Sequence, residues 1–123
     1  MQNISLEGHT ILIVEDEPLI AMDITAACEA AGATVFAAAS LDAATPLVER
    51  DELSAAVFDF GFKDGGDSSG LCMRLNERAI PFVLHSGYRH LGGASRRGIV
   101  VEKPASPIEI VNVLDRLLGG HNA

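Results

Sequence analysis

The sequence predicts a single α/β domain built on a parallel β-sheet. Short, almost wholly apolar runs alternate along its 123 residues with stretches whose apolar residues recur at helical spacing. Continuous apolar runs are typical of strands that are buried on both faces. Four of these runs are followed directly by acidic residues, a hydroxyl or a lysine. Ligands of open α/β sheets bind beyond the carboxyl ends of the strands, so these polar groups indicate a site there.

Composition and charge exclude several classes of function. The chain contains 9 Lys and Arg residues and 17 Asp and Glu residues, a formal net charge of −8. A nucleic-acid or anionic-membrane surface needs a basic face, which argues against both partners. No apolar run approaches the roughly 20 residues of a membrane span. Residues 1–10 are polar and lack a basic segment, so we expect no signal peptide.

The two cysteines suggest a reducing compartment. Cys28 and Cys72 both fall in predicted helices and have no metal-ligand spacing. We expect them to be reduced, buried and packed as small apolar residues, as in a cytoplasmic protein.

The first two strands and the helix between them are expected at residues 10–14, 18–31 and 34–38. Pro18 suits the first turn of a helix, and Gly32 stands just past its end. The residues at helical spacing that should face the sheet are Ile20, Ile24, Ala27 and Ala31.

The second helix carries a proline inside its pattern. Ser40 is a candidate cap for a helix through Leu41, Ala44, Leu47 and Val48, but the ring of Pro46 clashes with a preceding helical turn. We therefore expect this helix to be kinked, or to start late with Thr45 as its cap.

The remaining strands are expected at residues 55–59, 82–86 and 99–102. A glycine- and acid-rich loop at residues 61–70 precedes a third helix, which is marked by Leu71, Leu75 and Ala79. The last helix begins with a capping box, because Ser106 is followed by Pro107 and then by Glu109 three residues after the serine. Its expected buried stripe is Ile110, Val113, Leu114, Leu117 and Leu118, and Gly119 and Gly120 end it.

The segment 87–98 breaks the alternation of strands and helices. It joins the fourth and fifth strands, is rich in glycine and has no apolar stripe, so the fourth helix must be very short, irregular or mobile. It also carries Arg89, Arg96 and Arg97 and no acid on an otherwise acidic chain. We expect this segment, with Tyr88, to be a switch and recognition surface.

Three carboxylates are expected to meet at the strand ends. Two like charges at about 4 Å repel by about 4 kcal/mol at an effective dielectric of about 20, so Glu15, Asp16 and Asp59 must bind a cation or take up a proton. A site of oxygen ligands alone suits Mg²⁺, and a backbone carbonyl after Asp59 is a further candidate ligand. Ser86 adds a hydroxyl donor and Lys103 a fixed positive charge. These are the parts that phosphoryl transfer to a carboxylate needs.

Each of these groups also has a structural explanation. An acid pair before a helix complements the helix dipole, Asp59 can cap a loop, Ser86 can belong to a turn, and Lys103 can be a solvated lysine. Their occurrence at four successive strand ends favours the functional interpretation.

The motifs Ile13-Val14-Glu15-Asp16-Glu17-Pro18, Asp59, Ser86 and Lys103-Pro104 resemble the receiver domain of bacterial two-component response regulators. The resemblance covers residues 8–118, nearly the whole chain. We expect the chain to form one receiver domain spanning residues 1–123. The resemblance implies a flavodoxin-like, doubly wound sheet of five parallel strands in the order 2-1-3-4-5, flanked by five helices.

The resemblance also implies roles for individual residues. Asp59 is the phosphoacceptor, served by a sensor histidine kinase. Asp16 and Asp59 hold Mg²⁺ directly, Glu15 holds it through water, and the Gly61 carbonyl completes the protein ligands. Ser86 takes the place of the family's Ser/Thr, and Lys103 that of the lysine that bridges to the phosphate.

The chain departs from the family pattern at several positions. Lys63 stands where receivers carry proline, and Val100 where they carry a switch aromatic. Tyr88 follows Ser86 closely, which is similar to a subgroup with a Phe-Ala-Thr-Gly-X-Tyr motif, found in alphaproteobacteria with HWE-type sensor kinases. His85 and Ser86 replace the Ala and Thr of that motif, and one residue is missing before Tyr88.

We therefore expect a stand-alone receiver that acts as a phosphoacceptor switch and not as an enzyme. Its output is either a protein contact or the draining of phosphate from a shared kinase. Two alternatives stay open. A phosphatase with an aspartyl-phosphate intermediate carries a second Asp two residues after its nucleophile, where this chain has Gly61. A receiver-like scaffold that is never phosphorylated would not need the full set of acids and Lys103.

Overall fold

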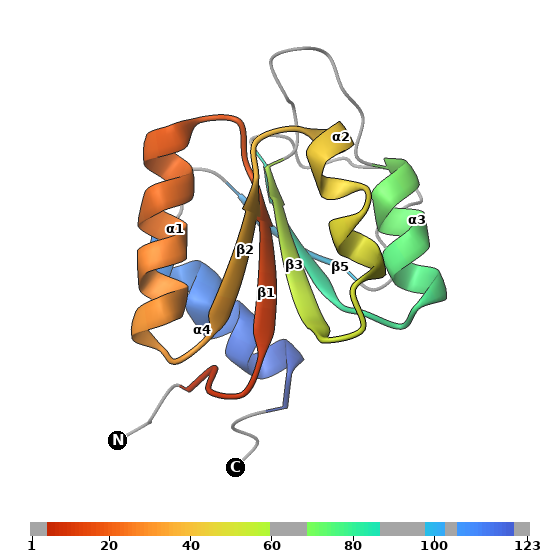
Figure 1. The fold of residues 1–123 in the computed structure, drawn as a ribbon. Coiled ribbons are helices and arrows are strands. Elements are labelled where there is room, and N and C mark those ends of the chain that lie inside the picture. Colours follow the sequence, from red (N-terminus) through yellow and green to blue (C-terminus); the bar gives the residue numbers. More distant parts are fainter. Residues whose placement is uncertain (1–4, 60–68, 87–97, 103–105, 120–123) are drawn as a thin grey trace.

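A computed structural model of the chain describes residues 5–59, 69–86, 98–102 and 106–119 (Figure 1). Its sheet is parallel, with the strands in the order β2-β1-β3-β4-β5. The doubly wound α/β class is confirmed: the first four strands follow the expected order, and β5 pairs with β4 at the edge. The elements are β1 Thr10–Val14, α1 Pro18–Ala30, β2 Thr34–Ala38, α2 Leu41–Ala44, the 3-10 helix η1 Leu47–Glu49, β3 Leu53–Asp59, α3 Ser69–Glu77, β4 Phe82–Ser86, β5 Gly98–Glu102 and α4 Pro107–Leu117.

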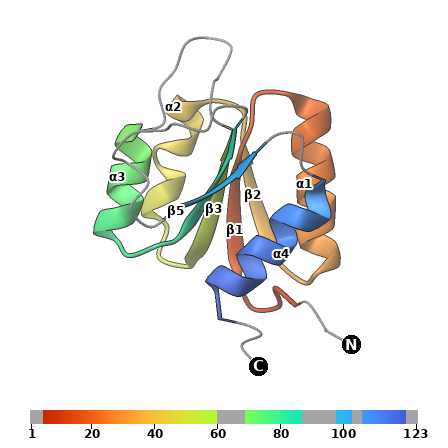
Figure 2. The same cartoon turned by 180° about the vertical axis from the view of Figure 1, so that it is seen from behind.

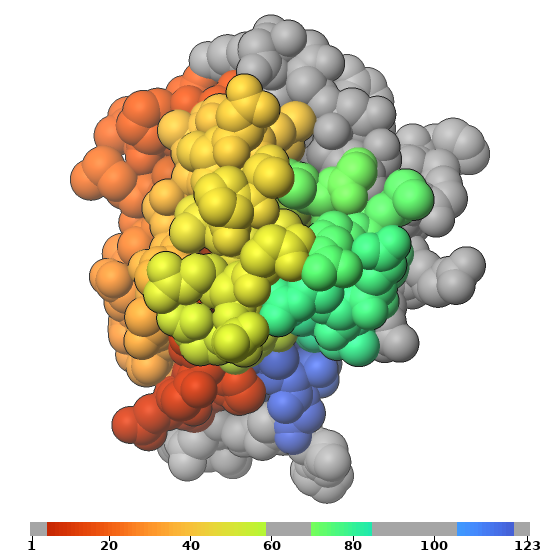
Figure 3. Space-filling view, turned by 45° about the vertical axis from the view of Figure 1, so that its right-hand side comes forward, coloured from red at the N-terminus to blue at the C-terminus, as the bar shows by residue number. Residues whose placement is uncertain are grey.

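Helices cover both faces of the sheet. Helices α1 and α4 lie on one face, and α2, η1 and α3 on the other (Figures 1 and 2). Figure 3 shows α2 and η1 lying beside α3 on the second face. Strand β1 is buried along its whole length, because its residues alternate between two apolar cores. Leu12 and Val14 pack on the α3 side, and Ile11 and Ile13 on the α1 side.

The described residues contain four α-helices and η1, where the family resemblance implied five helices. The short or irregular fourth helix was expected within residues 87–98, and residues 87–97 lie outside the described part of the chain. Strands β3 and β5 begin at Leu53 and Gly98, slightly earlier than expected.

Helix α1 buries Ile24 and Cys28, but Ile20 is 36% exposed. The expectation that Ile20 faces the sheet was therefore wrong. Ile20 lies in the first turn of α1, and the buried residues of the helix lie in its later turns. Both cysteines are free and buried, as predicted.

Pro46 breaks the second helix. Helix α2 ends at Ala44, and the chain resumes as η1 one residue after the proline. The break was predicted, and so was the cap, since the Ser40 hydroxyl accepts from the Ala43 amide at 3.0 Å. The alternative with Thr45 as a cap was wrong: the Thr45 hydroxyl donates back to the Leu41 carbonyl at 2.9 Å.

Helix α3 ends at Glu77, so Ala79 lies beyond it and not on its buried stripe. The capping box at the start of α4 is confirmed, with the Glu109 carboxylate accepting from the Ser106 amide at 2.7 Å. The buried face of α4 includes Val111 and Asp115, whereas Val113, Leu117 and Leu118 are only half-buried.

The core begins earlier in the chain than residue 8. Leu6 is fully buried, and its amide donates to the Ala31 carbonyl at 2.7 Å. The segment before β1 therefore closes the base of the α1–α4 layer.

Candidate functional site at the carboxyl ends of the strands

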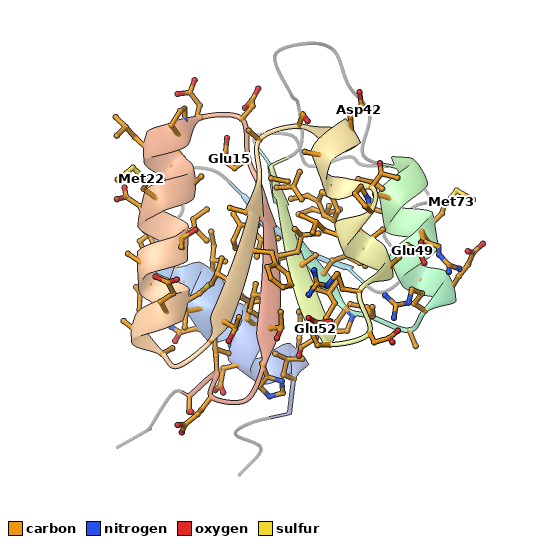
Figure 4. The ribbon with its side chains drawn as sticks, in the orientation of Figure 1. Glu15, Met22, Asp42, Glu49, Glu52 and Met73 are labelled. Atoms are coloured by element: carbon orange, nitrogen blue, oxygen red, sulfur yellow. The ribbon has the colours of Figure 1, made fainter. Side chains whose placement is uncertain are left out.

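Glu15 is a buried carboxylate directly after β1. Its amide donates to the carbonyl of Ala38 at 3.0 Å, which extends the pairing of β1 with β2 by one residue. Its side chain is held locally, because Oε2 accepts from the amide of Glu17 at 3.0 Å. Glu15 is only 3% exposed and lies near the upper ends of β1 and β2 (Figure 4). The β1–α1 connection thus fixes one carboxylate at the strand ends.

Asp16 and Glu17 follow at the start of α1. Glu17 is the N-cap residue with extended backbone, and Pro18 occupies the first helical turn. Both acids are half-buried. The positive end of the helix dipole lies at this turn and favours negative charge beside it. The sequence therefore places an acidic cluster where the fold tolerates it.

The backbone of Asp59 ends β3 next to this cluster. Val14 pairs with Phe58, so Glu15 and Asp59 each stand one residue beyond the last paired positions of two adjacent strands. Adjacent strands lie about 4.8 Å apart. Asp59 itself pairs with His85 of β4. The register therefore brings Glu15 and Asp59 to the same edge of the sheet.

Ser86 and the end of β5 complete the row. Ser86 is the last residue of β4 and pairs with Glu102, the last residue of β5. Lys103 follows Glu102 directly in the chain and lies outside the described residues. The structure thus brings the backbone positions of Asp59 and Ser86 to the edge where Glu15 lies, as expected from the sequence.

Several predicted site residues cannot be placed in the same way. Gly61, Lys103, Tyr88, Arg89, Arg96 and Arg97 lie outside the described residues, so their roles stay predictions. No group of three or more His, Cys, Asp or Glu side chains suited to a metal occurs among the side chains described, a set that does not include Asp59. Of the predicted magnesium ligands, Glu15 and Asp16 are the two whose side chains belong to the described part of the chain.

Two backbone groups at this edge were not anticipated from the sequence. The Ala38 carbonyl and the Glu17 amide are the partners that fix Glu15. The second is a contact between residues two apart, which the sequence allows but does not require. The first depends on the register of β1 with β2, which no sequence motif encodes.

Helix length bears on membrane insertion. None of the helices in the described ranges is both long enough and apolar enough to cross a bilayer.

Several solved structures with a similar fold are response regulators or their receiver domains. A receiver protein from Sinorhizobium medicae WSM419 is 28% identical, with a TM-score of 0.80 over 93% of this chain and 97% of that one. The response regulator PhyR from Brucella abortus is also 28% identical, with a TM-score of 0.77 over 93% of this chain and 49% of PhyR. The chemotaxis regulator CheY4 of Vibrio cholerae shares the fold, with a TM-score of 0.75 at 16% identity.

Comparisons of sequence alone gave no match, either to a family model or to a curated protein. The structural likeness at 28% identity and the row of polar residues at the strand ends agree with each other. Together they support a response regulator receiver domain.

Proposed function

We propose that this chain is a receiver that accepts a phosphoryl group on Asp59 from a sensor histidine kinase. The observation that carries the proposal is the register, which puts the end of β3 beside the buried carboxylate of Glu15. The likeness to the S. medicae receiver covers nearly the whole of both chains and supports the same assignment.

The donor set fits Mg²⁺. Glu15, Asp16 and Asp59 offer only oxygen ligands, the kind that Mg²⁺ prefers, and the carbonyl of Gly61 would add another. When bound, Mg²⁺ neutralises charge on the carboxylates and on the incoming phosphoryl group. The buried Glu15 carboxylate uses one oxygen for the Glu17 amide, which holds it in place for a role through water.

In the proposed transfer, a carboxylate oxygen of Asp59 attacks phosphorus. The bond between phosphorus and the kinase's histidine nitrogen breaks, and the imidazole leaves with the electron pair. Ser86 donates a hydrogen bond to the transferred group, and Lys103 pairs with its negative charge. The acyl phosphate then ends by hydrolysis, without turnover of a separate substrate, so the protein is a switch and not an enzyme.

Tyr88 with Arg89, Arg96 and Arg97 would form the surface that responds to phosphorylation. These arginines form a basic segment on a chain that is otherwise acidic. We propose that they meet an acidic patch on the kinase or on a downstream partner. A cytoplasmic kinase fits this scheme, and the resemblance around Tyr88 favours one of HWE type. Output by protein contact and output as a phosphate sink differ in the lifetime of the acyl phosphate, which is short for a sink.

The direct test is labelling with a small phosphodonor and Mg²⁺, followed by intact mass. We expect one phosphoryl group on the wild type and none on Asp59→Asn, which keeps the size of the side chain but removes the nucleophile. Asp51→Asn, an exposed acid just before β3, is the matched control and should label as the wild type does. Equal labelling of the Asp59 variant would refute the assignment.

A further inference from the structure

The connection from β2 to β3 contains two very short helices. Helix α2 has four residues and η1 has three, and Pro46 between them has no amide to donate. Helices this short are not stable on their own, so their stability comes from tertiary contacts. Ala44 and Val48 supply part of it by burial in the α3-side core.

Arg78 satisfies the end of η1. Its Nη1 donates to the carbonyl of Val48, and to the carbonyl of Arg50 at 3.1 Å. The last carbonyls of a helix have no partner within it. Arg78, which directly follows α3 and is half-buried, therefore gives the Val48 carbonyl the donor that a longer second helix would have supplied itself. It adds a second donor at the Arg50 carbonyl, which also accepts from the Leu53 amide at 3.2 Å.

Arg74 makes a second link between the same two elements. Its Nε and Nη2 donate to the two carboxylate oxygens of Glu49 at 2.6 and 2.7 Å, and its Nη1 donates to Glu77 at 3.1 Å. Such a bidentate pair fixes the relative orientation of the guanidinium and the carboxylate as well as their distance. Glu49 lies beside α3 in Figure 4.

Arg50 links the same connection to the sheet. Its guanidinium lies 4.7 Å from the ring centroid of Phe36 on β2, and Nη2 pairs with Glu52 at 2.6 Å. The end of η1 is thus tied to α3 by Arg74 and Arg78 and to the edge strand by Arg50.

We infer that Arg74 and Arg78 form a clasp between α3 and η1, and that breaking it opens residues 41–52 locally while the sheet stays folded. The Arg74–Glu49 side chains are 44% and 48% exposed, so salt screens this part of the clasp. The clasp lies at the start of β3, and Asp59 at its other end, so the inference does not depend on phosphorylation.

Amide hydrogen exchange tests the clasp on the unphosphorylated full chain. The reporters are the amides of Arg50 and Leu53, which donate to Leu47 and Arg50 carbonyls, and the reference is the amide of Ile13 in β1. In Arg78→Met we expect the reporters to exchange about tenfold faster or more relative to the reference, because two hydrogen bonds from a charged donor are lost.

Arg116→Met is the matched control, since Arg116 is an exposed arginine near the C-terminal end of α4, as Arg78 is a half-buried arginine just past the end of α3. Both variants lose one positive charge and its interaction with a helix dipole. Reporter amides that speed up no more in Arg78→Met than in Arg116→Met would overturn the inference.

A second measurement does not depend on Arg78→Met folding. Glu49→Gln removes the charge of the partner of Arg74 on the surface, and we expect a smaller rise at the same reporters. In the wild type, molar salt should raise the exchange rate of the reporter amides by a similar factor. In Glu49→Gln, molar salt should raise it no further. Reporter amides that exchange only together with Ile13 under all these conditions would show that the connection opens only with the whole fold, and the clasp would be rejected.

Discussion

Ala79 follows α3 with a positive φ angle, as Gly32 does after α1. Their φ angles are +59° and +103°. The hydrogen bonds match as well: Ile80 donates to Leu75 at 2.9 Å and Ala79 to Asn76 at 3.1 Å, just as Ala33 donates to Cys28 at 3.0 Å and Gly32 to Glu29 at 2.9 Å. This is a Schellman cap, which glycine usually completes. Helix α3 therefore ends with a strained alanine in a glycine position.

Ala79→Gly should stabilise the protein. A left-handed conformation costs an L-residue about 1–2 kcal/mol, and part of that gain is offset by the greater entropy of glycine in the unfolded chain. Ala79 is exposed, so little packing is lost. We expect the free energy of unfolding in urea to rise by about 0.5–1 kcal/mol.

The matched change in the other cap should act in the opposite direction. In Gly32→Ala, the added Cβ would lie 3.0 Å from the Cα of Glu7 in addition to adopting the strained φ. We expect a loss of more than about 1 kcal/mol. A loss of stability in Ala79→Gly would contradict the backbone strain that we assign to Ala79.

Leu6→Ala should be strongly destabilising. The side chain is fully buried between α1 and the rest of its layer, so truncation leaves a cavity. We expect a loss of about 2–5 kcal/mol in the free energy of unfolding. Leu19→Ala is the control, because Leu19 is 73% exposed and its loss should stay within about 0.5 kcal/mol. Similar losses in both variants would mean that the segment before β1 is not part of the core.

Most of the fold could be predicted because its signals are local. Residues 11–14 are apolar throughout since β1 is buried on both faces, and Ser106 with Glu109 marks the start of α4 within four residues. Leu6 was missed because a single apolar residue between Ser5 and Glu7 has no periodicity.

What could not be predicted depends on contacts between distant parts of the chain. Arg78 bonds with carbonyls about 30 residues away, which no spacing in the sequence reveals. Ile20 was assigned to the buried face because helical periodicity does not show how far along a helix the burial extends.

The candidate site was predictable in its backbone positions. The carboxyl ends of parallel strands lie at one edge, so Asp59 and Ser86 had to end up on the side of Glu15. Tertiary register then added what the motifs did not contain, the pairing of the Glu15 amide with Ala38.

The free energy of unfolding should fall at alkaline pH because of the ionisation of Cys28. Burial, and next the charge of Glu29, raise the pKa of this thiol from 9.0 to about 11. The unfolded chain therefore releases this proton first, so stability is lost as the pH rises from about 9 to about 11. In Cys28→Ala the free energy of unfolding should fall less steeply over this range. A slope unchanged by the substitution would mean that the thiol ionises equally in both states.

Mg²⁺ should raise the melting temperature, because it relieves repulsion among Glu15, Asp16 and Asp59. A ligand in roughly tenfold excess over its Kd stabilises the native state by about 1.4 kcal/mol. Thermal melts with and without millimolar Mg²⁺ measure this. Asp16→Asn should largely remove the shift, and Asp23→Asn, an exposed acid on α1, should keep it. A shift that survives in Asp16→Asn would place the metal elsewhere.

The segment 87–98 should respond to phosphorylation and carry the recognition arginines. Its sequence is rich in glycine and has no apolar stripe, so local opening should cost little free energy. It begins directly after Ser86, and movement of that hydroxyl toward a phosphoryl group would pull on it. NMR spectra with and without a phosphoryl mimic should change at these residues, with Tyr88 among them.

Charge reversal tests the recognition role separately. Arg96→Glu combined with Arg97→Glu should slow phosphotransfer from the kinase by lowering the rate of association, and the effect should weaken as salt rises. Labelling by a small phosphodonor should be unaffected, because that reaction needs no docking surface. Arg116→Glu, on α4, changes the net charge by as much as Arg96→Glu alone and is the control for that single variant. If Arg116→Glu slows transfer as much as Arg96→Glu does, the arginines act only through the overall charge of the protein and recognise no partner.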